Sequence, residues 1–336
     1  MDLDKVIFLS CLAVIVTIFN SICLGIIIRS RQLMNRSSHQ AIASLLLVHV
    51  IQGVFVIPSY AAKKAKFTDD PHIKGVICDI FRFSYIFTTH LSSMSIVLIT
   101  IDRVWAVKKP HSYGAKSTKY MKWAILGAFL YVLILCAVPF IPTSERKGTC
   151  KYVPQKEWVV FMFFGITFLV LVTILAGYVY VLLQWLKYQR EFNDLMNEKE
   201  DLSRRQSGLS NPSFRRDRRK MTVMTFSIVL SYVLCFGPSF FYNILWHLCV
   251  ACFPEDYDNS STEQTVGFII KVLTFINGIL SPLIYCIFDK NFKQRVKSIR
   301  YKRDRRQQAQ QQNDMISNIS RSNQNSCTIN PNTQEN

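Results

Sequence analysis

Apolar residues along this chain are gathered in long blocks, and polar residues are confined mainly to the breaks between them. A helix needs about 20 mostly apolar residues to cross a bilayer. Since lipid offers the backbone no hydrogen-bond partners, each block is expected to be a helix, and the blocks lack the alternation of barrel strands. The pattern predicts an all-α membrane protein with a seven-transmembrane helix bundle. The predicted helices cover approximately 6–28, 41–62, 77–107, 119–141, 157–186, 219–251 and 264–288.

The segments outside these blocks complete the predicted organisation. Residues 1–5 are a short N-terminal segment, and the first block is interpreted as a retained helix because its apolar run is longer than that of a signal peptide. Residues 289–301 have the spacing of a short amphipathic helix on the membrane surface. Residues 302–336 are rich in Gln, Asn and Ser and are predicted to be disordered.

The basic residues gather on one side of the predicted bundle. Four segments, 29–36, 102–122, 187–220 and 289–336, together hold 29 basic and 11 acidic residues and so account for the net charge of +18. Because Lys and Arg accumulate in cytoplasmic loops, this side is expected to be cytoplasmic and the N-terminus extracellular, in a multi-pass protein of the plasma membrane. This explanation needs no nucleic acid, and it suggests anionic lipid or an acidic partner as the counterpart of the basic side.

The third predicted helix carries chemistry at both ends. Asp102-Arg103-Val104 lies at its inner end, and Cys78 lies at its outer end. Cys150 lies in the next outer loop, in the compartment where disulfides persist. A Cys78–Cys150 bridge would fasten that loop to the top of the third helix.

Motifs in the later helices extend this pattern. The sixth helix carries Cys235-Phe236-Gly237-Pro238, and the seventh carries Ser281-Pro282-Leu283-Ile284-Tyr285 after Asn277. Each motif alone is weak, whereas their order, spacing and topology together are specific. On these residues the chain resembles the rhodopsin-like (class A) G-protein-coupled receptors over roughly Val6–Ile299. Five further residues also match positions of this family's sequence pattern: Asn20, Pro58, Pro110, Tyr113 and Phe292.

The resemblance implies a receptor that binds an extracellular small ligand and activates a heterotrimeric G protein, and we expect the ligand to be either anionic, as two cations described below suggest, or a small peptide. Pro238 and Pro282 each remove a backbone hydrogen bond and permit a kink, so the sixth helix could swing its inner end outward. It also implies arrestin and kinases as partners of the tail. The residues expected to carry coupling and switching are Asp102, Arg103, Tyr178, Phe236, Pro238, Ser281, Pro282 and Tyr285.

Several positions depart from the family's pattern. His49 stands where the second helix usually has a sodium-binding Asp, and imidazole is a poor Na⁺ ligand, so no sodium modulation is expected. We expect His49 to be bonded to Asn20, with a proton switch as the less favoured alternative. Arg218 stands where many members have an acid, so it should repel Arg103 and leave a measurable basal activity. Ser281 and Phe236 also replace the family's Asn and Trp.

The ligand is constrained mainly by exclusion. The family's amine-binding Asp falls at Tyr85, which argues against a monoamine. The retinal-binding Lys of opsins falls at Phe275, and Lys271 lies one turn further out, so photoreception is a less favoured alternative.

Two cations near the outer end suggest an anion site. Arg82 and Lys271 lie about one turn inside the membrane, where charge is costly and indicates function. Both could face one cavity and bind a carboxylate or phosphate. An equally weighted alternative pairs Arg82 with Asp79, and Lys271 with Glu263 or a neighbouring helix. The ligand-pocket candidates are Arg82, Tyr85, Thr89, Phe236, Ser239, Phe240, Lys271 and Phe275.

The remaining features are local. Asn259-Ser260-Ser261 is a predicted glycosylation sequon on the outer side. Cys249 and Cys252 are either bridged or free. No metal site, cofactor or catalytic residue is predicted. The alternatives are a seven-helix transporter or channel, which the lack of an internal repeat disfavours, and a membrane enzyme, which the lack of a nucleophile–base pair disfavours.

Overall fold

The computed structural model describes residues 3–65, 70–109, 115–137, 167–202, 212–248 and 261–327. Within these ranges every regular element is a helix, which confirms the all-α class. The chain divides into two units, a bundle that ends at Asp289 and a tail that begins at Lys290.

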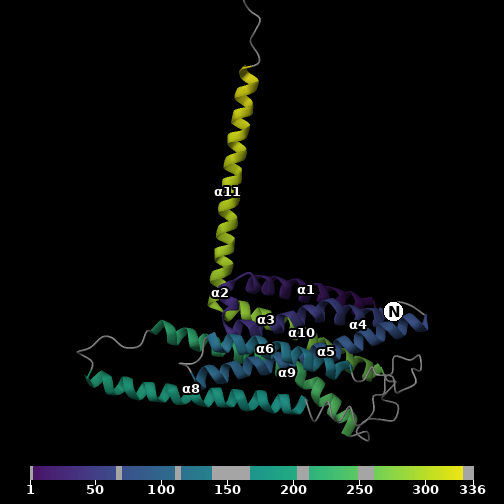
Figure 1. Cartoon of the computed structure of the whole chain (residues 1–336). Coiled ribbons are helices and arrows are strands. Elements are labelled where there is room, and N and C mark those ends of the chain that lie inside the picture. The colour runs from purple at the N-terminus through teal and green to yellow at the C-terminus, as the bar shows by residue number, and fades with distance from the viewer. Residues whose placement is uncertain are drawn as a thin grey trace, which may run out of the picture. The chain divides into compact units, whose positions relative to one another are not determined.

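Seven helices of the described chain are long and apolar enough to cross a membrane, as the sequence predicts. The second is continuous through three elements, α3, the π-helix η1 and α4, and follows the short helix α2 (Arg31–Met34). Figure 1 shows the helices side by side. Their bounds are α1 Leu3–Ile28, α3 Ser37–Ile51, η1 Gln52–Val56, α4 Ile57–Ala65, α5 Pro71–Lys108, α6 Ala115–Ala137, α8 Phe168–Leu202, α9 Pro212–Leu248 and α10 Ser261–Phe288.

Helix α5 begins six residues before its predicted start at 77. The Asp70 carboxylate accepts a hydrogen bond from the His72 backbone N–H at 2.8 Å, and Pro71 occupies the first turn. An N-cap Asp followed by Pro is a favourable helix start, so the helix begins at this cap instead of at the first long apolar run.

Helices α8 and α9 continue beyond their apolar blocks. Helix α8 reaches Leu202 instead of 186, and α9 starts at Pro212 instead of 219. Both project past the other helices at the end where residues 203–211 join them (Figure 1). The predicted start of the fifth helix, at 157, lies outside the described residues.

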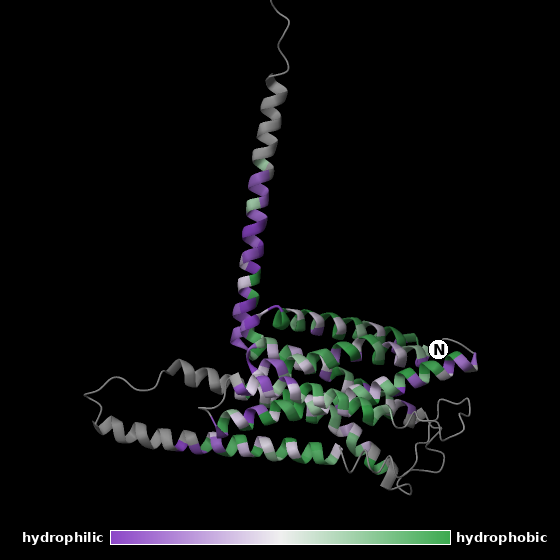
Figure 2. Ribbon diagram, viewed as in Figure 1, coloured by the Kyte–Doolittle hydropathy of each residue, from purple (hydrophilic) through white to green (hydrophobic). Residues whose placement is uncertain are grey.

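The outer surface of the bundle is apolar. Large side chains such as Ile134, Trp123 and Leu234 are each more than 60% exposed, and hydrophobic residues, green in Figure 2, make up much of the bundle helices. Water would not tolerate so large an apolar surface, whereas lipid does. This surface is the one expected of a bundle that stands in a membrane.

Glycine allows close approach of helices at two positions. A Cβ on Gly53 would lie 2.4 Å from the Thr17 hydroxyl and 3.0 Å from the Thr17 backbone nitrogen. A Cβ on Gly177 would lie 2.4 Å from a methyl group of Thr100. Small residues at helix interfaces let backbones approach, and here they fix η1 against α1 and α8 against α5.

The tail forms one helix, α11 (Lys290–Cys327). The sequence predicts a helix that ends at 301 and disorder from 302, and the structure differs because the helix continues through 302–327. Lys, Arg and Gln are good helix formers, and neither Gly nor Pro occurs in this segment. The low hydrophobicity of 302–327 predicts disorder, but it does not prevent these residues from forming a solvent-exposed helix.

Candidate functional site

Candidate functional residues lie at both ends of the bundle and in the core between them. We call the end near Ile28, where α1 finishes, the basic end. We call the end near Leu3, where α1 begins, the N-terminal end. Since α5 and α10 run in the same direction as α1, Asp102 and Tyr285 lie at the basic end, and Arg82 and Lys271 lie toward the N-terminal end.

Asp102 and Arg103 form a buried ion pair near the basic end of α5. A guanidinium nitrogen of Arg103 donates to one carboxylate oxygen of Asp102, and both residues are less than 10% exposed. The Ser37 hydroxyl of α3 donates to the other oxygen at 2.5 Å, and Ser117 of α6 donates to Ser37 at 3.2 Å. The Asp102 carboxylate thus joins three helices and holds Arg103 against its own helix.

Tyr178 of α8 lies beside this ion pair. Its buried hydroxyl is close enough to Arg103 and Asp102 for electrostatic interaction, and its ring lies 6.1 Å from that of Phe226 of α9. The structure therefore brings three of the predicted coupling residues together. The side chain of Arg218, predicted to repel Arg103, is not among the described side chains.

Tyr285, the last residue of the seventh-helix motif, is fully buried at the basic end of α10. The ring of His39 of α3 stands edge-on to it, 6.0 Å between centroids. His39 Nε2 lies 3.2 Å from the Asp289 carboxylate, and both side chains are 0% exposed. A buried contact between His39 and Asp289 thus links the start of the second span to the end of the seventh, directly against Tyr285.

The middle of the bundle contains a polar cluster around His49. His49 Nε2 lies 3.5 Å from the side-chain nitrogen of Asn277, whose side-chain oxygen accepts from Ser231 of α9 at 3.4 Å. The expectation that His49 bonds to Asn20 is therefore corrected. Asn20 instead donates to the backbone carbonyl of Gly278 at 2.7 Å, because α1 approaches α10 closely there.

Phe236, the predicted switch residue, is buried in α9 two residues before the helix-internal Pro238. Its ring stacks on Tyr232 with 4.5 Å between centroids. The Tyr232 hydroxyl hydrogen-bonds to Ser93 of α5. A movement of Phe236 would therefore act on a contact between α9 and α5.

Aromatic rings fill the N-terminal end between α1, α4, α5 and α10. Tyr60 stacks on Phe81 at 5.0 Å and on Phe268 at 6.3 Å, and meets Phe275 edge-on at 6.0 Å. Tyr85 lies 6.4 Å from Phe275, within hydrogen-bonding reach of Thr274 and Ser239. We call Tyr60, Phe81, Tyr85, Phe268 and Phe275 the aromatic cluster.

Four lysines from three spans lie over rings of this cluster. Lys271 and Lys64 lie 5.6 and 5.9 Å from the Tyr60 centroid. Lys63 lies 5.9 Å from that of Phe81, and Lys5 lies 5.6 Å from that of Phe268. Cations at these distances are attracted to the negative ring faces, and together they make this end of the cluster positive.

Other pocket candidates have separate roles. Arg82 pairs with Asp79 on its own helix at 3.5 Å, which is the alternative that the sequence left open for Arg82. The backbone carbonyl of Thr89 accepts from Ser93 at 2.9 Å. Phe240 packs against the exposed Phe241 at 5.7 Å. The side chain of Glu263, an alternative partner of Lys271, is not described.

Cys78 is disulfide-bonded near the N-terminal end of α5. Its predicted partner Cys150, the sequon at Asn259 and the pair Cys249 and Cys252 all lie outside the described residues. No group of three or more His, Cys, Asp or Glu side chains within the described ranges could hold a metal ion.

Sequence reasoning missed two parts of this arrangement. Tyr60, the centre of the aromatic cluster, was absent from the candidates, although its place two residues after Pro58 and level with Lys271 was a usable signal. The His39–Asp289 pair gave no signal, because its partners are distant in sequence and each sits in a segment that reads as polar connection.

This arrangement of spans, buried Asp-Arg pair and proline-containing sixth and seventh helices can be compared with known proteins. A sequence model described as "7 transmembrane receptor (rhodopsin family)" matches residues 19–285. The chain belongs to this family. The match confirms the resemblance found in the motifs and the seven-transmembrane fold.

Individual relatives within the rhodopsin family are distant. The beta-2R octopamine receptor of Chilo suppressalis is 23% identical over 285 residues, which cover 76% of this chain and 69% of that protein. Galanin receptor 2a of Danio rerio is 22% identical over 298 residues, covering 84% and 74%. The neuropeptide S receptor of Mus musculus is 23% identical over 243 residues, covering 67% and 62%. These relatives are receptors, and their names include both amine and peptide ligands.

Proposed function

We propose that this rhodopsin-family receptor binds a small extracellular ligand at the N-terminal end of the bundle and activates a heterotrimeric G protein at the basic end. In this proposal the basic end faces the cytoplasm of a cell whose plasma membrane holds the receptor, and the N-terminus is extracellular. The placement of all the net positive charge at one end supports this orientation.

The observation that carries the coupling half of the proposal is the buried Arg103 at the basic end. Its guanidinium is neutralised by Asp102, which is itself held by Ser37. A buried Arg with one nearby acid becomes a strong hydrogen-bond donor once that pair opens. Opening would expose Arg103 between α5, α8 and α9, where a partner's backbone carbonyls could accept from it.

The path from ligand to Arg103 passes through α9. The Phe236–Tyr232 stack and the Tyr232–Ser93 hydrogen bond tie α9 to α5 in the core. Pro238 lies just beyond Phe236 and weakens the helix there, so displacement of Phe236 favours a different packing of the inner part of α9. Tyr285 would rearrange in the same step, since it occupies the neighbouring helix at the same end.

The ligand half of the proposal is an anion with an apolar body. The four lysines over the aromatic cluster make a positive field from three spans, and Tyr60, Phe81 and Phe268 supply stacking surface. Lys271 is the deepest of these cations, and its ammonium group would meet the carboxylate or phosphate. Octopamine appears in the name of one relative, but Tyr85 stands here where an amine needs a carboxylate.

Coupling is tested by expressing the receptor in cells with a G-protein activation sensor of broad specificity and recording signalling in the absence of added ligand. Arg103→Ala should abolish activity above that of mock-transfected cells. Lys119→Ala, an exposed cation of α6, is the matched control and should leave activity unchanged. Equal signalling by the wild type and Arg103→Ala, at equal surface expression, contradicts the proposal.

The anion proposal is tested by a screen of carboxylates, phosphates and amines against the same sensor. An active anion should lose at least about tenfold in potency in Lys271→Ala, because one charge-assisted hydrogen bond contributes roughly 1.5–3 kcal/mol. The matched control is Lys74→Ala, an exposed cation near the start of α5. An amine agonist, or unchanged potency in Lys271→Ala, rules out the anion site while leaving G-protein coupling intact.

A further inference from the structure

Two cysteine side chains meet between the first and seventh spans. The Cys23 sulfur of α1 and the Cys286 sulfur of α10 lie 3.4 Å apart, which is hydrogen-bonding distance for two thiols. Cys23 is 1% exposed, whereas Cys286 is partly exposed, and both are thiols in the structure. A disulfide joins two sulfurs at about 2.0 Å, so the pair needs only a small approach to become covalently bonded.

Close packing of α1 against α10 holds the two thiols together. Three residues before Cys23, the Asn20 side chain donates to the Gly278 backbone carbonyl of α10 at 2.7 Å. A Cβ on Gly278 would lie 3.2 Å from a methyl group of Val16, so the two helices are in close contact there as well. The thiols therefore face each other across a packed interface between two helices.

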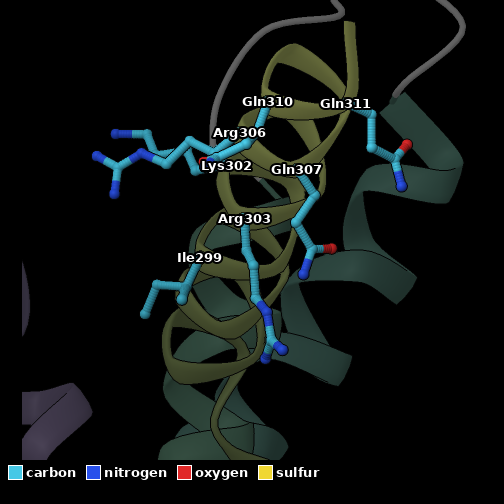
Figure 3. Close-up of a pocket in the computed structure, with 7 residues that line it drawn as sticks. All are labelled: Ile299, Lys302, Arg303, Arg306, Gln307, Gln310 and Gln311. Atoms are coloured by element: carbon cyan, nitrogen blue, oxygen red, sulfur yellow. The ribbon is translucent and has the colours of Figure 1, made fainter. Parts of the chain in front are cut away.

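The surroundings of this pair decide which reagents reach it. Both cysteines lie within apolar spans, near the ends of α1 and α10. The tail helix α11 differs, because exposed Lys302, Arg303 and Arg306 line a hollow there (Figure 3). Since charge is costly in lipid, an uncharged oxidant carried by the membrane reaches Cys286, whereas a charged cytosolic reductant such as glutathione is kept away from the pair.

We propose that Cys23 and Cys286 are a redox modification site, which forms a disulfide when lipid peroxyl radicals arise in the surrounding membrane. One peroxyl radical takes the hydrogen atom of the Cys286 thiol and a second takes that of Cys23, so two S–H bonds break and two lipid hydroperoxides form. The two thiyl radicals then pair their electrons in the S–S bond. Two thiols are oxidised and two peroxyl radicals are reduced, and no ion is formed in lipid.

The disulfide acts on the basic end of the bundle. Cys286 follows Tyr285 directly and comes four residues after Pro282, and Tyr285 is close enough to both sulfurs for electrostatic interaction. A bond to α1 therefore holds this part of α10 in its present packing. The consequence for signalling rests on the proposed function, in which Tyr285 rearranges. Oxidation lowers ligand-independent signalling, and a small uncharged dithiol restores it by reducing the S–S bond and becoming a disulfide itself.

The test uses the full-length receptor in liposomes that contain a lipid-soluble azo initiator, which produces peroxyl radicals in the bilayer when warmed in air. The receptor is then denatured, its remaining thiols are alkylated, and a digest is searched by mass spectrometry for the Cys23 and Cys286 peptides joined with loss of two hydrogen atoms. This joined peptide should appear in the wild type and in the control Cys11→Ala, which removes an exposed thiol of α1. Its absence from the wild type, under treatment that oxidises Cys11, overturns the proposal.

The same liposomes are assayed for nucleotide exchange on added G protein. Exchange should fall at least about fivefold in the joined wild type, as for a typical allosteric coupling, and should recover with dithiothreitol. Treatment should leave exchange unchanged in Cys286→Ala and in Cys23→Ala. An equal loss in the wild type and in these variants overturns the proposed restraint on α10, because oxidation elsewhere then explains the effect, and so does unchanged exchange in the joined wild type.

The two measurements separate failure of this inference from failure of the proposed function. An untreated receptor that shows no exchange with any class of G protein refutes the proposed function. The joined peptide still decides, in that case, whether Cys23 and Cys286 are a redox site, because its formation needs no G protein.

Discussion

The buried contact between His39 and Asp289 gives the sharpest test of how the basic end is held. The two side chains lie 3.2 Å apart, both 0% exposed, and the His39 ring packs edge-on to Tyr285. His39→Leu removes the imidazole from beside the buried Asp289 carboxylate. Removal of one partner from a buried pair costs about 3–5 kcal/mol, and loss of the aromatic contact adds about 0.5–1.5 kcal/mol.

The double variant separates the cost of removing one partner from the net contribution of the pair to the free energy of unfolding. Asp289→Leu alone should also destabilise by about 3–5 kcal/mol. The double variant His39→Leu/Asp289→Leu should lose much less, because neither polar side chain then stays buried after loss of the other. The coupling between the two substitutions should exceed roughly 2 kcal/mol, well above the ~0.5 kcal/mol found between independent sites. This coupling is the quantity that a direct pairing of the two side chains predicts.

Stability can be followed with a thiol-reactive dye, because Cys23, Cys136 and Cys235 are free and buried in the folded bundle. Purified receptor in detergent is heated, and the midpoint of dye labelling is compared among the wild type, the two single variants and the double variant. Additive midpoints, with the double variant the least stable of the four, would refute the reasoning. They would mean that the two side chains stabilise the bundle through separate contacts.

Two further predictions use other contacts. Gly53→Ala should lower the labelling midpoint by an amount equivalent to about 1–3 kcal/mol, because the added Cβ meets Thr17. The control Gly127→Ala, whose Cβ meets nothing within 4 Å, should leave the midpoint unchanged or raise it. Equal midpoints for the two variants would show that α1 and η1 are not closely packed at Gly53. Tyr232→Phe removes the hydroxyl bonded to Ser93 and should raise ligand-independent signalling by loosening α9 from α5, and a fall in signalling at equal expression would contradict this.

The membrane spans were predictable from the sequence because length and apolarity decide them, while their ends were not. Helix α5 starts at the Asp70 cap, and such a cap is a local signal that the apolar pattern outweighed. Helix α11 continues past 301 because its Lys, Arg and Gln residues favour helix even though nothing in them favours burial. The distribution of charged and apolar residues predicts which segments lie in lipid, but it predicts the residue at which a helix ends less well.

In the candidate site too, some residues could be predicted from the sequence and others could not. Asp102, Arg103 and Tyr285 were located by motif spacing. Their partners Ser37, Ser117 and His39 come from other helices and have no pattern of their own, so only the packing reveals them. The corrected partner of His49 has the same cause, since the packing of α1 and α10 against α3 decides whether Asn20 or Asn277 reaches the imidazole.

The central claim is that this bundle transmits a signal to a G protein and is not a conduit for solutes. The most direct measurement reconstitutes the purified receptor with purified heterotrimeric G proteins of each class and follows nucleotide exchange, alongside ion and solute flux through liposomes made from the same preparation. The account predicts exchange above that of receptor-free membranes with at least one class, lost in Arg103→Ala, and no flux above empty liposomes. Flux that persists in Arg103→Ala, without exchange for any class, would contradict it and favour a transporter or channel.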